Sequence, residues 1–295
     1  MSIDVNQALN YPFTPAQNSY TPRDTSLYAL SIGMAADPTD AADLPFVYEL
    51  SGKGHRAFPT MAVTFPFELL PQLFEIPGFT FNPMMIVHGE QYFELKRPLP
   101  TAATFANHAR ISHLYDKGSG ALLIMETRSL DDDGEEVALN RSSFFIRGMG
   151  GFGGERGPSG KINTPPEREP DAVFSQQTQP NQALLYRLNS SGDRNPLHAD
   201  PQMAAFGGFD RPILHGLCTY GFAARAVLKQ FAGNDNGRFR NMQARFSKHV
   251  FPGETLVTNM WQESDTRIIF QTKVAERDEI VLTNAAVELN EQDGE

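Results

Sequence analysis

Alternating apolar and polar positions predict a run of antiparallel strands in each half of the 295-residue chain. Each run begins with a strand, a proline-containing turn and a second strand, and further strands follow around polar turns. The stretches that carry this pattern are 88–105, 109–130 and 137–148 in the first half, and 243–261, 265–277 and 280–290 in the second. The repeated order indicates two similar units in tandem, although their residue identity is weak.

One helix is expected ahead of each run of strands. The stretch 213–230 is long and rich in small and apolar residues, with Leu217, Tyr220 and Ala224 at helical spacing. The candidate at 67–74 in the first half is short, because Pro66 and Pro71 interrupt it. A helix beside a bent antiparallel sheet predicts the α+β class, and two such units predict a pseudodimer. A doubly wound parallel sheet would need alternating strands and helices, and the last third of the chain has no helical pattern to supply them.

A glycine- and proline-rich stretch separates the two units. GMGGFGGERGPSG begins at Gly148, and KINTPPEREP and SQQTQP follow it up to Pro180. Glycine and proline disfavour regular structure, so this stretch predicts a linker. We therefore expect a first domain over 1–150, a linker over 151–180 and a second domain over 181–295, each domain with its own core.

Composition and charge exclude several classes of protein. The 25 Lys and Arg against 35 Asp and Glu give a net charge of −10, which disfavours nucleic acids and anionic membrane surfaces as partners. The single cysteine, Cys218, excludes an internal disulfide and a cysteine-rich zinc site. No apolar run is long enough to cross a membrane, the start lacks the pattern of a secretory signal, and the terminal NEQDGE forms no tripeptide address. The cytoplasm is the expected location, with the peroxisome as the alternative if the protein is eukaryotic.

Polar residues suited to catalysis concentrate between Tyr186 and Leu228. Asp193 and His198 lie five positions apart across Asn195-Pro196, a dipeptide that favours a turn and can direct both side chains into one cleft. An imidazole with a pKa near neutrality and an adjacent carboxyl group can together move two protons, which suits the addition or removal of water. Asp200 precedes a proline and is interpreted as the cap of a short helix through Phe206.

Gly216 is a candidate binding group for a carbonyl oxygen. If Arg211-Pro212 opens the long helix, Gly216 lies in its first turn, where a backbone N–H has no partner within the helix. The missing side chain leaves room for a substrate, and such an N–H can stabilise an oxygen that gains negative charge.

The stretch YRLNSSGDRNPLHADPQMAAFGGFDRPILHGLCTYG resembles the hydratase 2 motif of the MaoC-like, (R)-specific 2-enoyl-CoA hydratases. The first half, with YTPRDTSLYALSIG and HGEQYFELKRPLP, is similar to the eukaryotic form of that family, so the resemblance covers nearly the whole chain. It implies a double hot-dog fold and the reversible syn hydration of trans-2-enoyl-CoA to (3R)-3-hydroxyacyl-CoA in fatty acid metabolism. It also implies that no metal or organic cofactor takes part.

The resemblance assigns roles to particular residues. Asp193 and His198 would activate water and move its protons, Asn195 would position that water, and the N–H of Gly216 would hold the thioester oxygen. The first half would be the degenerate repeat that accommodates the acyl chain: it keeps Asp24 but has no histidine five positions later. Candidate lining residues for the acyl chain are Phe74, Phe79, Phe81, Met84 and Met85.

CoA carries phosphates, so an acidic protein needs a local group of cations to bind it. The candidates for substrate binding are Arg211, His215, Arg245, Lys248, His88 and Lys96. His215 directly precedes Gly216, and it could instead fix the loop by a hydrogen bond. The resemblance also implies pairing of two chains into a homodimer, and an exposed strand edge of the meander would permit it.

Three other functions remain open at this stage. A hot-dog thioesterase would direct water to the thioester carbon, although the Asn-Pro-Leu-His spacing disfavours it. A metal hydrolase would use Asp193, His198 and Asp200 as ligands, but Asp200 is already explained as a cap. A non-catalytic acyl-CoA-binding protein would leave the pair of Asp193 and His198 idle.

Overall fold

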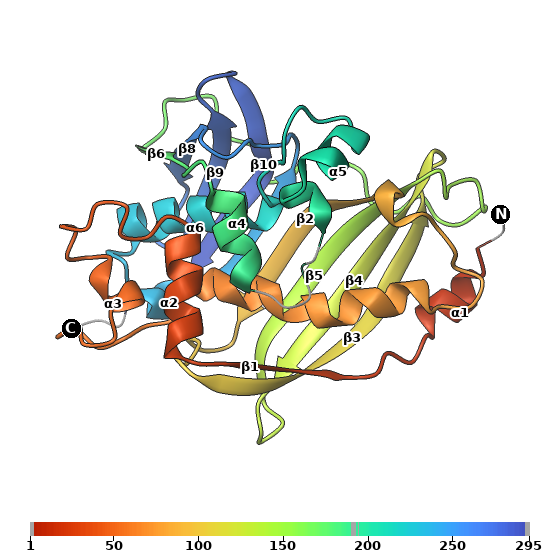
Figure 1. Ribbon diagram of the computed structural model, residues 1–295, viewed down its shortest axis with the longest axis horizontal. Coiled ribbons are helices and arrows are strands. Elements are labelled where there is room, and N and C mark those ends of the chain that lie inside the picture. Colours follow the sequence, from red (N-terminus) through yellow and green to blue (C-terminus); the bar gives the residue numbers. More distant parts are fainter. Residues whose placement is uncertain (1–2, 190–192, 194, 293–295) are drawn as a thin grey trace.

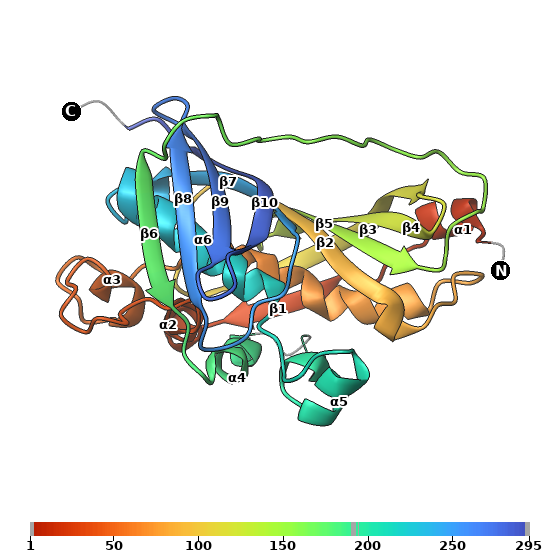
Figure 2. The same cartoon turned by 90° about the horizontal axis from the view of Figure 1, so that it is seen from above.

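The computed structural model describes residues 3–189, 193 and 195–292, which form one antiparallel sheet of ten strands partly wrapped around helices (Figures 1 and 2). The strands of the first half are β1 (Ala16–Tyr20), β2 (Ile86–Leu95), β3 (Ala103–Asp116), β4 (Gly120–Leu130) and β5 (Glu136–Arg147). Those of the second half are β6 (Ala172–Gln177), β7 (Phe239–Phe246), β8 (Thr255–Gln262), β9 (Arg267–Val274) and β10 (Glu279–Leu289). The strands expected from the alternating pattern are confirmed, as is the α+β class.

The two halves repeat the same strand order around a central pair. From the centre outwards the order is β2-β5-β4-β3-β1 in the first half and β7-β10-β9-β8-β6 in the second. β2 and β7 join the halves as an antiparallel pair that runs from Glu90 opposite Arg245 to Glu94 opposite Asn241. The predicted repeat is therefore confirmed by topology.

The expectation of a separate core in each half is partly wrong: a cluster that includes Leu69, Leu123 and Ile146 belongs to the first half alone, but the main core is shared. The largest core cluster takes residues from both halves, and the ring of Phe93 on β2 stacks on that of Phe239 on β7 at 5.7 Å. Because the two strands are hydrogen-bonded neighbours, the apolar face of the sheet continues from one half into the other and closes around shared helices.

The long helix α6 (Gly216–Phe231) is buried along most of its length, from Leu217 to Leu228. A helix that is apolar on nearly all sides belongs in the interior of a fold. Its expected start at residue 213 is wrong by three positions. The backbone groups of Ile213 and Leu214 bond outside the helix. The carbonyl of Ile213 lies 2.9 Å from the Nδ1 atom of His198, and the Leu214 N–H donates to the carbonyl of Val250 at 2.7 Å.

The helical candidate of the first half is longer than expected. It forms the 3-10 helix η1 (Pro59–Phe74), which passes through both Pro66 and Pro71 instead of stopping at them. η1 packs against β2, β3 and β5, and its residues Phe65 and Leu69 are fully buried. This burial against the sheet stabilises a conformation that the prolines alone would disfavour.

The predicted linker is partly wrong. Residues 148–171 run without a helix or strand along the outside of the molecule, as the green trace in Figure 2 shows. From Ala172, however, the chain forms the edge strand β6, which pairs with β8. The pairing supplies the hydrogen bonds that this stretch cannot make by itself.

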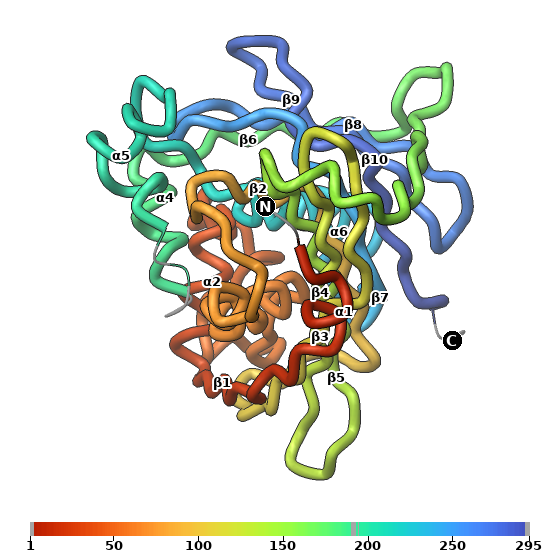
Figure 3. The backbone as a smooth tube through the Cα atoms, turned by 90° about the vertical axis from the view of Figure 1, so that its right-hand side faces the viewer, coloured from red at the N-terminus to blue at the C-terminus, as the bar shows by residue number. Residues whose placement is uncertain are grey.

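The remaining helices are short. They are α1 (Val5–Leu9), α2 (Pro22–Ser31), α3 (Leu44–Val47), η2 (Pro83–Met85), α4 (Gln182–Tyr186), η3 (Arg187–Asn189), η4 (Pro196–His198), α5 (Pro201–Phe206) and η5 (Asn236–Arg238). Figures 2 and 3 show α4 and α5 together on the side of the molecule away from β7 to β10. The segment that carries the catalytic candidates, from α4 to α5, therefore lies on this side of the molecule, just before α6 in the chain.

Candidate active site

Two consecutive caps shape the segment that carries the catalytic candidates. The side-chain Oδ1 of Asn195 accepts the N–H of Leu197 at 3.1 Å and starts η4, so the expected turn is confirmed. Asp200 Oδ1 accepts the N–H of Gln202 at 2.8 Å and starts α5, which ends at Phe206. Both caps satisfy backbone donors at the start of a helical turn, and they fix His198 between them.

The ring of His198 is oriented by a backbone carbonyl. Its Nδ1 lies 2.9 Å from the carbonyl oxygen of Ile213, which can only accept a hydrogen bond. The proton of the neutral ring is therefore on Nδ1, and Nε2 carries a lone pair. Burial lowers the pKa of His198, while the Ile213 carbonyl and the charge of Asp193 oppose that shift. His198 is suited to accept a proton at Nε2.

The pKa of Asp193 shifts in the opposite direction to that of His198. Burial raises the pKa of its carboxyl group, while His198, the N–H of Asn195 and Arg187 oppose that shift. Its side chain is 11% exposed. Because burial raises the pKa of the acid and lowers that of the base, the two values approach each other, and moving a proton between the groups costs less than it would in water.

Gly216 is the first residue of α6, at the end of the helix where backbone N–H groups have no intrahelical acceptor. No described residue accepts its N–H, whereas the carbonyl of His215 accepts from Cys218 and Thr219. A Cβ atom at Gly216 would lie 3.1 Å from the ring of Phe246. Because Gly216 has no side chain, the space between its backbone N–H and the Phe246 ring stays open.

These groups line one cavity of about 570 Å³. Asp193, His198 and Gly216 form a polar end, and Asn195 also borders the cavity. The apolar part of the wall comes from η1, η2 and the strands β2, β5 and β7: Phe67, Leu70, Leu73, Phe74, Met84, Ile86, Phe144 and Phe246. Of the five candidates for an acyl-lining wall, Phe74 and Met84 line this cavity. Phe79, Phe81 and Met85 do not, and Phe79 is a core residue at 1% exposure.

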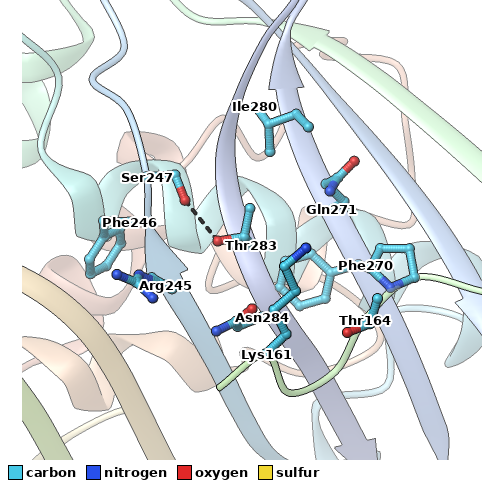
Figure 4. A pocket seen from close by; sticks show the side chains of 11 residues that line it. Lys161, Thr164, Arg245, Phe246, Ser247, Phe270, Gln271, Ile280, Thr283 and Asn284 are labelled. Atoms are coloured by element: carbon cyan, nitrogen blue, oxygen red, sulfur yellow. Dashed lines mark hydrogen bonds between the residues drawn. The ribbon is translucent and has the colours of Figure 1, made fainter. Parts of the chain in front are cut away.

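A second cavity of about 540 Å³ lies next to the first, and both share Phe246 and Ser247 (Figure 4). Lys161 and Thr164, in the segment 148–171 that runs along the outside of the molecule, line this cavity together with Arg245 of β7 and Thr283 of β10. Asn163 holds that segment in place: its side chain donates to the Asn284 carbonyl at 3.1 Å and accepts from Arg267 at 2.7 Å.

The structure brings two of the six substrate-binding candidates to these cavities as exposed cations. Lys248 borders the first cavity and Arg245 the second, where Arg245 lies 3.9 Å from Glu90. Arg211 lines neither cavity, because its guanidinium group lies over the Phe251 ring at 4.8 Å. Lys96 also lines neither and pairs with Glu94 at 2.8 Å. Arg211 and Lys96 therefore lie outside both cavities, and their part in substrate binding stays a prediction.

Two histidine candidates are at the cavity but are not cations. The ring of His88 packs between Phe144 and Phe246, and burial lowers its pKa to about 4. His215 is 3% exposed, and burial lowers its pKa well below the usual value. Neither ring is charged near neutral pH, so a contact of either with the substrate would not be that of a cation with phosphate, and their part in substrate binding stays a prediction.

Sequence reasoning missed two basic residues. Arg147, at the end of β5, borders the catalytic cavity, and Arg187 in η3 acts electrostatically on Asp193 and His215. Arg147 lies at the end of a predicted strand, just before the predicted linker. This position is the one feature of the sequence that could have indicated a role for Arg147 at the site. Arg187 lies within the motif, but nothing in the local pattern distinguishes it from a solvated charge.

Replacing Gly216 with Val is expected to lower kcat/KM for the reaction proposed below by about 100-fold, the scale for impairing one oxyanion donor. The branched side chain would meet the Phe246 ring and occupy the place of the thioester oxygen. Steady-state kinetics would measure this loss, and Gly216→Ala should give a smaller one. Unchanged kinetics in the Val variant would remove Gly216 from the site.

Comparisons with known proteins agree with this arrangement. A family model described as the MFE-2 hydratase 2 N-terminal domain matches residues 18–148, and one described as a MaoC-like domain matches 161–285. A protein of Dictyostelium discoideum named probable enoyl-CoA hydratase 2 is 44% identical over 288 residues, with 96% of each chain covered. The chain belongs to the hydratase 2 family of MaoC-like proteins.

Other relatives extend across the same family. The peroxisomal enoyl-CoA hydratase 2 of Arabidopsis thaliana is 44% identical over 276 residues, with 90% of this chain and 88% of that protein covered. The mouse peroxisomal multifunctional enzyme type 2 is 45% identical over 287 residues. The match covers 96% of this chain and 38% of the mouse protein. A crystal structure of a MaoC-like dehydratase from Phytophthora capsici superposes with a TM-score of 0.87 at 38% identity, covering 99% of this chain and all of that one. The fold is the double hot-dog α+β fold of this family.

Two further observations concern the described part of the chain. None of its helices has the length and apolar character needed to cross a bilayer. It also contains no group of three or more His, Cys, Asp or Glu side chains arranged to hold a metal ion. Asp200, a ligand in the metal hydrolase alternative, instead caps α5.

Proposed function

We propose that this protein catalyses the reversible syn addition of water to a trans-2-enoyl-CoA, giving a (3R)-3-hydroxyacyl-CoA. The observation that carries the proposal is one cavity that is lined by Asp193, His198 and Gly216 together with a set of apolar side chains. The hydratase names of the relatives support the same reaction class.

The geometry supports a division of roles in this reaction. The N–H of Gly216 binds the thioester oxygen as it gains negative charge. His198 Nε2 accepts a proton from water as the water oxygen bonds to C3, and Asp193, whose neutral form is favoured by burial, delivers a proton to C2. The water O–H bond breaks while C3–O and C2–H bonds form. Proton return from His198 to Asp193 then restores the pair, so no redox cofactor is needed.

Asn195 is proposed to position the water. Its Oδ1 is already bonded to the Leu197 N–H, which orients the amide and leaves its NH₂ group to donate. The apolar channel lined by η1 and β2 is proposed to take the acyl chain, since an adaptable Met and aromatic wall suits an alkyl tail.

The CoA part is proposed to extend past Phe246 towards the second cavity. Lys248 and Arg147 at the first cavity, and Arg245 and Lys161 at the second, supply positive charge in a protein whose net charge is −10. Lys161 makes no hydrogen bond or ion pair to any residue within 3–189, 193 and 195–292. Such cations attract phosphate groups locally.

The double variant Lys161→Gln/Arg245→Gln is expected to raise KM for crotonyl-CoA about tenfold with little change in kcat, because each removed charge weakens phosphate binding. The N-acetylcysteamine thioester of crotonic acid lacks the nucleotide, so its kcat/KM should not change. Lys273→Gln, on the exposed end of β9 and paired with Asp278, is the matched control. Equal losses for both substrates would contradict this placement of CoA.

The experiment that tests the proposed function is the loss of enoyl-CoA ultraviolet absorbance, with crotonyl-CoA and trans-2-decenoyl-CoA as substrates and chelator present. Chiral chromatography of the product should give the (3R)-3-hydroxyacyl-CoA. A (3S) product or a requirement for metal would contradict the proposed reaction. Free CoA release would support the thioesterase alternative, and binding without turnover would support a non-catalytic acyl-CoA-binding protein.

We also propose that two chains pair in solution. The edge strands β1 and β6 each leave one side without a strand partner in the sheet, and Val173 on β6 is 54% exposed. Light scattering at the mass of a single chain would contradict a homodimer. A cytoplasmic location stays a prediction beside a relative named as peroxisomal, and fluorescence of the tagged protein in its own cells would test it.

A further inference from the structure

His215 lies directly behind the catalytic pair. It precedes α6, and its ring stacks on that of His198 with centroids 3.8 Å apart and planes 26° apart. The ring of Tyr186 packs against it at 5.1 Å. At 3% exposure His215 has no room to turn towards solvent, so its orientation is fixed by the two neighbouring rings.

The two ring nitrogens of His215 are the unexplained feature of this site. Neither makes a hydrogen bond to any residue that the structure describes, although both are buried. A buried polar group without a partner costs about 1–3 kcal/mol. For packing alone, a phenylalanine would fill the same space without that cost.

The nearest charged acceptor is Asp193. His215 Nε2 lies 3.6 Å from Asp193 Oδ2, slightly beyond hydrogen-bonding distance. Among the residues that the structure describes, the charged and titratable groups that face His215 are Asp193, His198, Arg187 and Tyr186. His198 and Arg187 oppose a positive charge on the ring, as does burial. The His215 ring is therefore neutral, and the tautomer with its proton on Nε2 would direct a donor at the Asp193 carboxyl group.

We propose that His215 is a positioning residue, a neutral imidazole that donates from Nε2 to the Asp193 carboxylate and fixes the ring plane of His198. This inference rests on the proposed hydratase reaction. There, Asp193 becomes a carboxylate when it gives its proton to C2, inside a site largely shielded from water. A donor that needs only a small approach to Asp193 can stabilise this developing charge, so its effect falls on the chemical step.

Two variants separate the hydrogen bond from the packing. His215→Phe keeps a flat ring beside His198 but loses the donor, and His215→Gln places an amide NH₂ group near the position of Nε2. We expect the Phe variant to lose about tenfold or more in kcat with little change in KM. The Gln variant should recover part of that loss. Equal activity of the wild-type and Phe enzymes would overturn the proposal.

The pH profile provides a readout that a purely structural role would not move. Without the donor, the charged form of Asp193 is disfavoured and the pKa of its carboxyl group rises. The limb of kcat/KM that depends on Asp193 should therefore shift to higher pH in His215→Phe and return towards its original position in His215→Gln. A lower kcat with an unshifted profile in the Phe variant would indicate packing alone and overturn the proposal.

Nitrogen-15 NMR of the histidine rings tests the same inference without any activity measurement. We expect His215 to stay neutral between about pH 5 and 8, with its proton on Nε2, and its Nε2 signal to change in Asp193→Asn. A proton on Nδ1, or titration near the ordinary value of about 6.5, would overturn the proposal. If the wild-type protein hydrates neither enoyl-CoA, the hydratase function fails, and the NMR result still decides the state of His215.

Discussion

Replacing His198 with Gln or Asp193 with Asn is expected to lower kcat for enoyl-CoA hydration by about 1,000-fold, the middle of the usual range for a general acid or base. Gln has no ring nitrogen to accept the water proton, and Asn has no acidic proton to give to C2. Both variants keep the approximate size of the side chain. The measurement is steady-state kinetics with crotonyl-CoA, together with the thermal unfolding midpoint.

Asp200→Asn is the matched control for these two variants. It lies two residues from His198, and Asn caps a helix about as well as Asp, so activity should stay within about twofold. Loss of activity in Asp200→Asn as large as that in Asp193→Asn would instead favour the metal hydrolase alternative. Loss of folding in Asp193→Asn and His198→Gln would contradict a mainly chemical role for the pair.

Replacing Arg225 with Met is expected to lower the free energy of unfolding by about 3–5 kcal/mol, the usual cost of breaking a buried ion pair from one side. Arg225 on α6 donates to Asp43 Oδ2 at 2.6 Å and to the side chain of Gln176 on β6. Asp43 is fully buried, and Asn234 and the N–H of Ala35 also donate to it. Removing the guanidinium group leaves this carboxylate without its counter-charge.

Urea denaturation measures this effect, with two comparison variants. Lys229 lies on α6 like Arg225 and forms a partly exposed ion pair with Asp40. Lys229→Met breaks this pair and should lower the free energy of unfolding by about 0–1 kcal/mol. The double variant Arg225→Met/Asp43→Leu removes both charges and should recover part of the loss. If Arg225→Met alone lowers the free energy of unfolding by less than about 1 kcal/mol, the ion pair does not hold the loop between α2 and α3, which carries Asp43, against α6.

Local patterns were sufficient for the elements whose partners are close in sequence. The alternating positions of the two meanders predict strands because antiparallel neighbours joined by short turns need no distant information. The Asn195-Pro196 turn and the Asp200 cap were predicted for the same reason, since each cap bonds an N–H two residues away. The catalytic pair could be indicated from sequence because one turn holds both members.

The errors fall where a distant partner decides the structure. α6 begins at Gly216 because His198 and Val250 take the backbone groups of Ile213 and Leu214. β6 forms in a stretch interpreted as linker because β8 offers it an unpaired edge. η1 passes through two prolines because its side chains are buried against the sheet.

The sequence by itself determined the α+β class, the tandem repeat and the position of Asp193, His198 and Gly216 in one window, because these depend on spacing along the chain. Only the tertiary structure decided which charges reach the cavity and which histidines stay neutral. Both depend on burial and on neighbours far away in sequence: Arg211 is held over Phe251, and His88 is enclosed by Phe144 and Phe246. The stacking of His215 on His198 beside Asp193 likewise exists only in the folded chain, because solvent is excluded there and the rings are held face to face.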